Sequence, residues 1–181
     1  MLSRARRVWQ IIFPPLSPLM STIARLLQEL HDRFQSETGG ALANYIPELA
    51  RADPNSFGIS LVTADGHRYS VGDCNREFTI QSISKTFAYG LALDEHGADA
   101  VLAKIGVEPS GEAFNEISLE TGTGRPFNPM INAGAIAATA MIPGPGMTAR
   151  FERLRHCLST YAGRELGVDE AVYRSGIRLA L

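Results

Sequence analysis

Long apolar runs, paired cysteines and an excess of positive charge are all missing from this sequence of 181 residues. No apolar stretch reaches the ~18 residues that a membrane-spanning helix needs, so we expect no membrane partner. The two cysteines, Cys74 and Cys157, lie far apart and lack metal-ligand spacing, which favours free thiols in a reducing cytoplasm. A net charge of −2 without a basic stripe argues against nucleic-acid binding.

The composition is typical of a globular protein large enough to bury a sizeable core. Hydrophobic residues make up 45% and charged residues 20% of the chain, as in ordinary soluble domains. The first 20 residues differ, because three arginines precede a short apolar stretch and three prolines, and no small-residue cleavage site follows. We predict a disordered leader over 1–20 and a folded part over 21–181.

Hydrophobic periodicity predicts both helices and strands. Helices are expected over 21–36, 82–96, 98–105, a small-residue stretch ending near 141, and 148–162. Two β-rich runs, 57–63 and 67–72, flank Asp65-Gly66 and predict a β-hairpin. We also expect the small-residue helix to pack tightly against neighbours, including the helix that starts at Ser82.

A serine and a lysine lie three residues apart at the start of the expected helix over 82–96. Residues i and i+3 share one helix face, so Ser82 and Lys85 should meet, whereas Ser84 points elsewhere. A buried lysine has a lowered pKa and can remove the proton of a serine nucleophile. The same four residues could also be a helix cap followed by a solvated lysine.

The histidines offer no comparable pattern. They are scattered along the sequence and have no acidic companion at catalytic or metal-binding spacing. We expect surface or capping roles for all four and no metal site. They are His31, His67, His96 and His156.

Four ordered motifs resemble the serine-dependent glutaminases. The likeness covers roughly residues 27–175 and includes the Asp65-Gly66 hairpin. The motifs are Tyr45-Ile46-Pro47-Glu48-Leu49-Ala50, Gln81-Ser82-Ile83-Ser84-Lys85, Gly106-Val107-Glu108-Pro109-Ser110-Gly111 and Asn128-Pro129-Met130-Ile131-Asn132-Ala133-Gly134-Ala135-Ile136.

The resemblance implies an α+β fold like that of the β-lactamases and DD-peptidases, in which helices flank an antiparallel sheet and a helical subdomain closes over the site. It implies hydrolysis of L-glutamine to L-glutamate and ammonia through an acyl-enzyme, without metal or organic cofactor. It also implies a homo-oligomer, a dimer or a tetramer.

Carried over position by position, the resemblance makes Ser82 the acylated nucleophile and Lys85 its base. Tyr45 and Gln81 would line the substrate pocket, and Asn132 would bind the amino-acid head group of glutamine. Two structural alternatives stay open at this point. Tyr45 could be core filling, and Asn132 could be a helix N-cap.

The resemblance weakens after Ser175. The family pattern continues there with a pocket glutamate and then Arg-Asn-x-Ala, whereas this sequence has Gly176 and ends at Leu181. The family's later pocket asparagine, two tyrosines and one oxyanion-hole residue have no counterpart. We therefore expect a glutaminase domain that is incomplete at the C-terminus, truncated or frameshifted, with impaired catalysis.

Two other functions are compatible with the sequence. A penicillin-recognising hydrolase of the same fold would use the same Ser82 and Lys85, although the asparagine-rich block at 128–136 speaks against it. A non-catalytic module that assembles with other chains is the alternative from another functional class.

Overall fold

The computed structural model describes residues 21–179, so the expected leader over 1–20 lies outside the described residues. The chain divides into two compact units, one ending at Glu77 and resuming at Arg174, the other running from Phe78 to Tyr173. Among residues 21–179, no helix is both long and apolar enough to cross a membrane.

The first unit begins with helix α1, Thr22–Phe34. Ser21 caps it, because the Ser21 hydroxyl accepts a hydrogen bond of 3.1 Å from the Ala24 backbone N–H. Leu27 is the buried residue of its apolar stripe. The predicted helix over 21–36 and its cap are confirmed.

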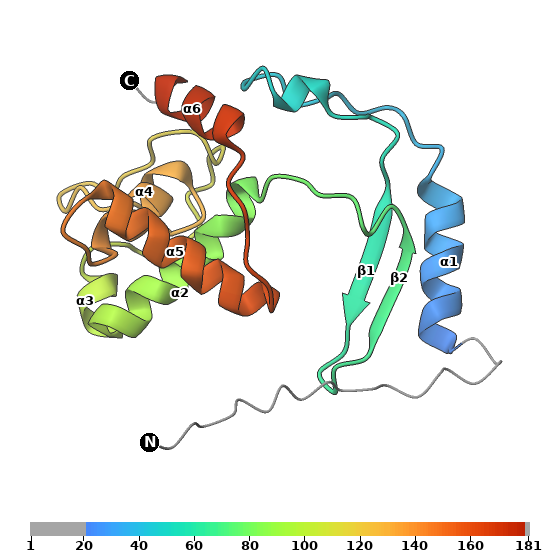
Figure 1. The fold of residues 1–181 in the computed structure, drawn as a ribbon. Helices are drawn as coiled ribbons and strands as arrows, with labels where there is room; N and C mark the ends of the chain where they lie inside the picture. The colour runs from blue at the N-terminus through green and yellow to red at the C-terminus, as the bar shows by residue number, and fades with distance from the viewer. Residues whose placement is uncertain (1–20, 180–181) are drawn as a thin grey trace, which may run out of the picture. The chain divides into compact units, whose positions relative to one another are not determined.

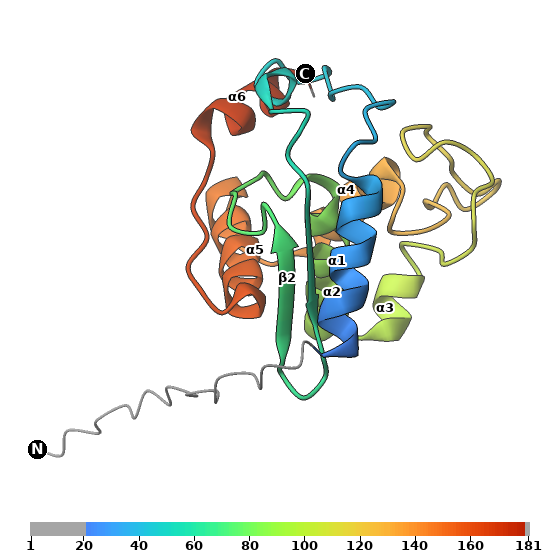
Figure 2. The same cartoon turned by 90° about the vertical axis from the view of Figure 1, so that its right-hand side faces the viewer.

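A β-hairpin follows, made of β1 (Gly58–Val62) and β2 (Arg68–Gly72). The strands are antiparallel, with Gly58 opposite Gly72 and Val62 opposite Arg68. Gly66 supplies the positive φ of 89° that the Asp65-Gly66 turn needs. Helix α1 packs along this hairpin (Figure 2). The hairpin is confirmed, but the sheet has two strands within residues 21–179, fewer than the resemblance implies.

The second unit is helical (Figure 1). Helix α2 (Ser84–His96) contacts α3 (Ala98–Leu102), α4 (Asn132–Met141) and α5 (Met147–Ala162). A cluster of fully buried residues forms its core and joins α2, α3 and α4. Its members are Ala92, Val101, Ile105 and Ala138.

Small side chains bring α2 and α4 close together, as the small-residue composition of α4 predicted. Ala88 and Ala92 are the buried residues of α2, and Gly134 and Ala138 are those of α4. A Cβ on Gly134 would lie 1.9 Å from the Asn128 carbonyl oxygen, so only glycine fits there. This approach fixes the start of α4 against the loop that precedes it.

Two helix boundaries and one further helix differ from the prediction. Helix α2 begins at Ser84 and not at Ser82, because a 3₁₀ turn over Gln81–Ile83 comes first. Helix α3 is shorter than the predicted 98–105 and ends at Leu102. Helix α6, Glu170–Leu179, was not predicted at all; its N-terminus is marked by Asp169, whose carboxylate accepts from the Ala171 and Val172 N–H groups.

Candidate active site

The Ser-x-x-Lys segment runs through the 3₁₀ turn into α2. A 3₁₀ turn places residues i and i+3 nearly in line, so Ser82 and Lys85 share one side of the segment. Ser82 is exposed and its hydroxyl has no hydrogen bond within the part of the chain that the structure describes. The predicted contact between Ser82 and Lys85 is not formed by a hydrogen bond here, and it stays a prediction.

Gln81 has a strained backbone directly before the serine. Its φ is +44°, and it is the one non-glycine residue with positive φ among residues 21–179. Such a conformation persists only where the surroundings impose it, and it is typical of functional sites. The Ser84 hydroxyl donates to the Gln81 carbonyl over 2.7 Å, and the Gln81 amide donates to the Thr79 hydroxyl over 2.9 Å. These bonds support the turn that displays Ser82.

Lys85 is held by two oxygen atoms from the segment that begins α4. Its Nζ donates to the Met130 carbonyl oxygen over 2.9 Å and to Asn132 Oδ1 over 2.7 Å. We call these two acceptors the lysine clamp. Lys85 and Asn132 are 47 positions apart in sequence, so only the packing of α2 against α4 brings them together.

The clamp is built by a tight turn around Asn128. Asn128 Oδ1 accepts from the backbone N–H groups of Met130 (3.0 Å) and Ile131 (3.2 Å). Ile131 is buried, and the Asn132 N–H donates to the Phe114 carbonyl oxygen over 2.8 Å. These hydrogen bonds and the burial of Ile131 hold the backbone that carries both acceptors of the clamp.

Burial lowers the pKa of the Lys85 ammonium from its ordinary value through desolvation. The Phe114 ring acts in the opposite direction: its centroid is 5.3 Å from Nζ, and a cation–π contact favours the ammonium. A lysine with a lowered pKa is more often neutral, as a general base must be. The direction of the shift agrees with the role predicted for Lys85.

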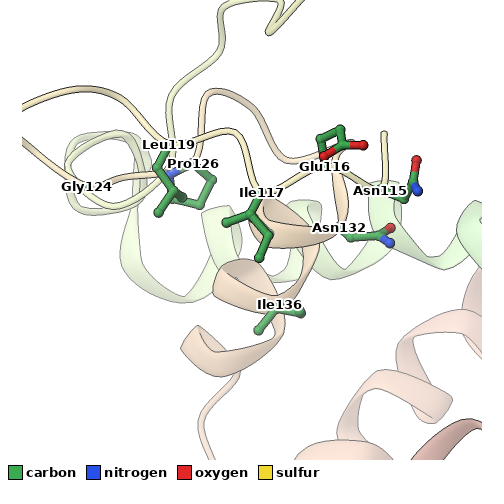
Figure 3. A pocket seen from close by; sticks show the side chains of 9 residues that line it. Asn115, Glu116, Ile117, Leu119, Gly124, Pro126, Asn132 and Ile136 are labelled. Atoms are coloured by element: carbon green, nitrogen blue, oxygen red, sulfur yellow. The ribbon is translucent and has the colours of Figure 1, made fainter. Parts of the chain in front are cut away.

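A pocket of about 340 Å³ opens beside the clamp, between the loop at 115–126 and the first turns of α4 (Figure 3). Ile117 and Ile136 are 81% and 71% exposed and form its apolar side. Asn132 reaches the polar side, near Asn115 and Glu116 (Figure 3). A small ligand with both polar and apolar parts would fit such a lining.

The predicted site residues divide between the two units. Gln81, Ser82, Lys85 and Asn132 all belong to the second unit, whereas Tyr45 belongs to the first. The role of Tyr45 toward the substrate stays a prediction. The alternative role of Asn132 as an N-cap is wrong, because α4 begins at Asn132 itself and the Asn132 side chain accepts from Lys85.

Sequence reasoning missed three contributors to this site. The Met130 carbonyl and the Phe114 ring both contact the lysine, and Asn115 lines the pocket. A backbone carbonyl leaves no trace in a sequence. Apolar residues in an otherwise polar loop, such as Phe114 and Ile117, were the available signal for the other contacts.

Two histidines lie near a carboxylate one or two residues away in sequence: His31 beside Asp32 at 3.9 Å, and His67 beside Asp65. His67 Nδ1 lies 3.2 Å from Asp65 Oδ2 in the hairpin turn, where both side chains are at least half exposed. This is a local turn pair and not a cluster, since no group of three or more metal-binding side chains occurs among residues 21–179.

Comparisons with known proteins agree with the motifs. The model of the family described as Glutaminase matches residues 40–180. A glutaminase of Nostoc sp. is 52% identical over 155 residues, covering 86% of this chain and 46% of that protein. The crystal structure of Mglu in its native form superimposes with a TM-score of 0.80 at 44% identity, over 87% of this chain and 39% of that one.

A third comparison includes a ligand. A probable glutaminase from Bacillus subtilis, complexed with 6-diazo-5-oxo-L-norleucine, matches with a TM-score of 0.74 and 31% identity, over 96% of this chain and 51% of that one. These likenesses confirm the predicted α+β fold of the β-lactamase type. The chain spans between 39% and 51% of the length of these relatives.

The match over residues 40–180, together with the identity to the Nostoc relative, shows that the chain belongs to the glutaminase family.

Proposed function

We propose that this chain carries the serine and lysine of an enzyme that hydrolyses L-glutamine to L-glutamate and ammonia without metal or organic cofactor. The observation that supports this most is the geometry of Lys85. Its Nζ is fixed by Met130 and Asn132, and the exposed Ser82 lies three positions before it in the sequence.

In the proposed reaction the Ser82 oxygen attacks the side-chain amide carbon of glutamine while neutral Lys85 takes the hydroxyl proton. The tetrahedral intermediate then collapses, and Lys85 returns the proton to the departing nitrogen, which leaves as ammonia. The product is an ester between Ser82 and the glutamyl group. Water hydrolyses this ester with the same lysine as base, which releases glutamate and restores the serine.

The substrate would lie between Ser82 and the pocket beside the clamp. Because Asn132 Oδ1 already accepts from Lys85, its Nδ2 can donate to a carboxylate of the substrate. Gln81 and Tyr45 are further proposed contacts. The diazoketone found with the Bacillus subtilis relative is an analogue of glutamine, which supports a glutamine-shaped site.

A covalent labelling experiment tests the proposal. The purified chain is incubated with 6-diazo-5-oxo-L-norleucine, its intact mass is measured, and ammonia release from glutamine is assayed in parallel. We expect an adduct on Ser82, and we expect Ser82→Ala to abolish both signals. Lys85→Ala should slow labelling by about 10²-fold or more, as loss of a general base does.

The matched control is Ser70→Ala, which removes an exposed hydroxyl of β2 far from the segment 81–85 in sequence. It should label like the unmodified chain. Since Gly176 occupies the position where the family has a pocket glutamate, labelling is the more sensitive of the two readouts. An adduct on another residue, or ammonia release that survives Ser82→Ala, would refute the proposal.

The proposal also includes a cytoplasmic location and a homo-oligomer, a dimer or a tetramer. Cys74 and Cys157 are both free thiols, which suits a reducing compartment. Light scattering on the purified chain measures the oligomeric state, and a monomer would contradict that part.

A further inference from the structure

The lysine clamp does more than hold a side chain in place. A protonated lysine has three N–H donors, and a neutral one has two N–H donors and one lone pair. The clamp offers two acceptors, the Met130 carbonyl and Asn132 Oδ1, at 2.9 and 2.7 Å from Nζ. In the neutral state both donors are therefore occupied, and the lone pair has one direction left.

We infer that Asn132 is a positioning residue for Lys85: with the Met130 carbonyl it occupies both N–H donors of the neutral amine and so directs the free lone pair to the proton of the nucleophile. This rests on the proposed function for the identity of the nucleophile. It assigns to Asn132 a task separate from substrate binding.

The same contact fixes the orientation of the Asn132 amide. An ammonium has no lone pair and can only donate, so the atom of Asn132 that faces the charged lysine is the oxygen, as in the structure. Both N–H groups of Nδ2 are then available to the pocket that Asn132 lines. Through the clamp, the protonation state of Lys85 is linked to the Nδ2 donor that Asn132 presents to the pocket.

Few charged groups compete for Lys85. Helix α4 has no titratable side chain along Asn132–Met141, and the 3₁₀ turn Gln81–Ile83 has none either. Helix α5 contributes Arg153, which bonds to Glu95, and the thiol of Cys157, which interacts with Asp94; both lie near the far end of α2. Helix α3 carries Asp99, beyond that same end.

The loop at 115–126 carries two acids: Glu116 lines the pocket, and Glu120 pairs with Arg125. The lowered pKa of Lys85 comes from desolvation, which agrees with an environment that offers neutral acceptors and no paired anion. Exchange of the Asn132 amide for a carboxylate would raise the pKa of Lys85, because a negative acceptor favours the charged lysine.

The sequence allows a direct measurement, because it holds two lysines, Lys85 and Lys104. In protein labelled with ¹³C-lysine, the Cε signals of the two residues can be followed through a pH titration by NMR. Lys104→Arg assigns them, and Lys104 serves as the internal reference. This readout does not depend on turnover.

Asn132→Asp should raise the pH midpoint of the Lys85 Cε titration by about one unit or more, because an adjacent opposite charge favours the ammonium. Asn132→Leu should lower it, because the ammonium loses an acceptor. The charge control is Asn115→Asp, which adds a carboxylate to the same pocket without a bond to Lys85 and should shift the midpoint less. If Asn132→Asp does not fold, Asn132→Leu alone decides, with circular dichroism to confirm its fold.

Equal midpoints in Asn132→Asp and Asn115→Asp, or no change in Asn132→Leu, would overturn the inference. The pH dependence of labelling by 6-diazo-5-oxo-L-norleucine then separates it from the proposed function. A labelling profile that moves with the Lys85 midpoint supports both. A midpoint that moves while the labelling profile stays would support the clamp and refute Lys85 as the base.

Discussion

At the scale of single residues, the backbone of Gln81 is the least ordinary feature near Ser82. Left-handed conformations cost a non-glycine residue about 1–2 kcal/mol, and Gln81 adopts one at φ +44°. This conformational cost is absent for glycine and larger for a β-branched residue. The strain is therefore open to measurement by substitution at this one position.

We expect Gln81→Gly to leave the free energy of unfolding unchanged within about 1 kcal/mol, because relief of strain offsets the greater freedom of glycine in the unfolded chain. Gln81→Val should lower it by about 1–3 kcal/mol. Urea unfolding of both variants measures the difference. Equal stabilities would show that the turn relaxes without strain.

Two helical glycines give a second residue-scale prediction. A Cβ on Gly134 would meet the Asn128 carbonyl at 1.9 Å, while a Cβ on Gly90 in α2 would meet nothing within 4 Å. Gly134→Ala should destabilise the fold by about 1–3 kcal/mol through overpacking. Gly90→Ala should stabilise it by about 0.5–1 kcal/mol through helix propensity.

The pair of glycine variants is its own control, since both make the same chemical change inside a helix. Urea unfolding gives the two differences directly. A Gly134→Ala variant as stable as Gly90→Ala would mean that α4 can move away from the Asn128 turn. In that case the lysine clamp would also be less fixed than its contacts indicate.

At the scale of elements, helix α1 depends on its cap. The Ser21 hydroxyl satisfies one of the free N–H groups of the first turn. Ser21→Ala should cost about 1 kcal/mol, and Ser21→Asp should restore most of it, because aspartate also caps well. The unfolding free energy from urea titration checks both; equal loss in the two variants would exclude capping as the cause.

The hairpin turn should respond to acid. A hydrogen bond from the Thr63 hydroxyl, followed by contacts with His67, lowers the pKa of Asp65 to about 2 from 3.8. A group with a depressed folded-state pKa stabilises the fold above its unfolded value and loses that contribution as pH falls through the folded one. Asp65 should thus stabilise the hairpin above about pH 4 and cease to do so near pH 2.

Asp65→Asn removes this titration and keeps a residue suited to the turn. Between pH 5 and pH 2 the urea midpoint should fall less in the variant than in the unmodified chain. Asp65 is exposed, so the difference will be small and is best measured at low salt. Parallel curves for the two proteins would argue against the predicted shift.

At the scale of the whole molecule, burial is uneven between the two units. The second unit contains the fully buried cluster of Ala92, Val101, Ile105 and Ala138. In the first, β1 has one half-buried residue, Ile59, among exposed neighbours. Backbone amides open most readily where few apolar contacts cover them.

Hydrogen exchange followed by mass spectrometry should therefore show slow exchange in peptides around 88–93 and 135–141. Peptides covering 58–72 should exchange much faster, despite their strand hydrogen bonds. Equal protection of the two regions would show that the hairpin opens only with global unfolding.

The sequence by itself determined much of the local structure and singled out the candidate for the reacting pair. Periodicity and capping predicted α1, the hairpin, α4 and α5, because these depend on residues close along the chain. The Ser-x-x-Lys spacing singled out Ser82 and Lys85 for the same reason. The strained Gln81 and the 3₁₀ start of the segment left no such local signal.

Only the tertiary structure decided what surrounds the lysine. The clamp joins Lys85 to a backbone carbonyl and an amide 45 and 47 positions away, and it forms because Gly134, Ala88 and Ala92 let two helices approach. A contact of this kind depends on packing across the core, where side-chain size and backbone position act together. Sequence spacing carries no record of it.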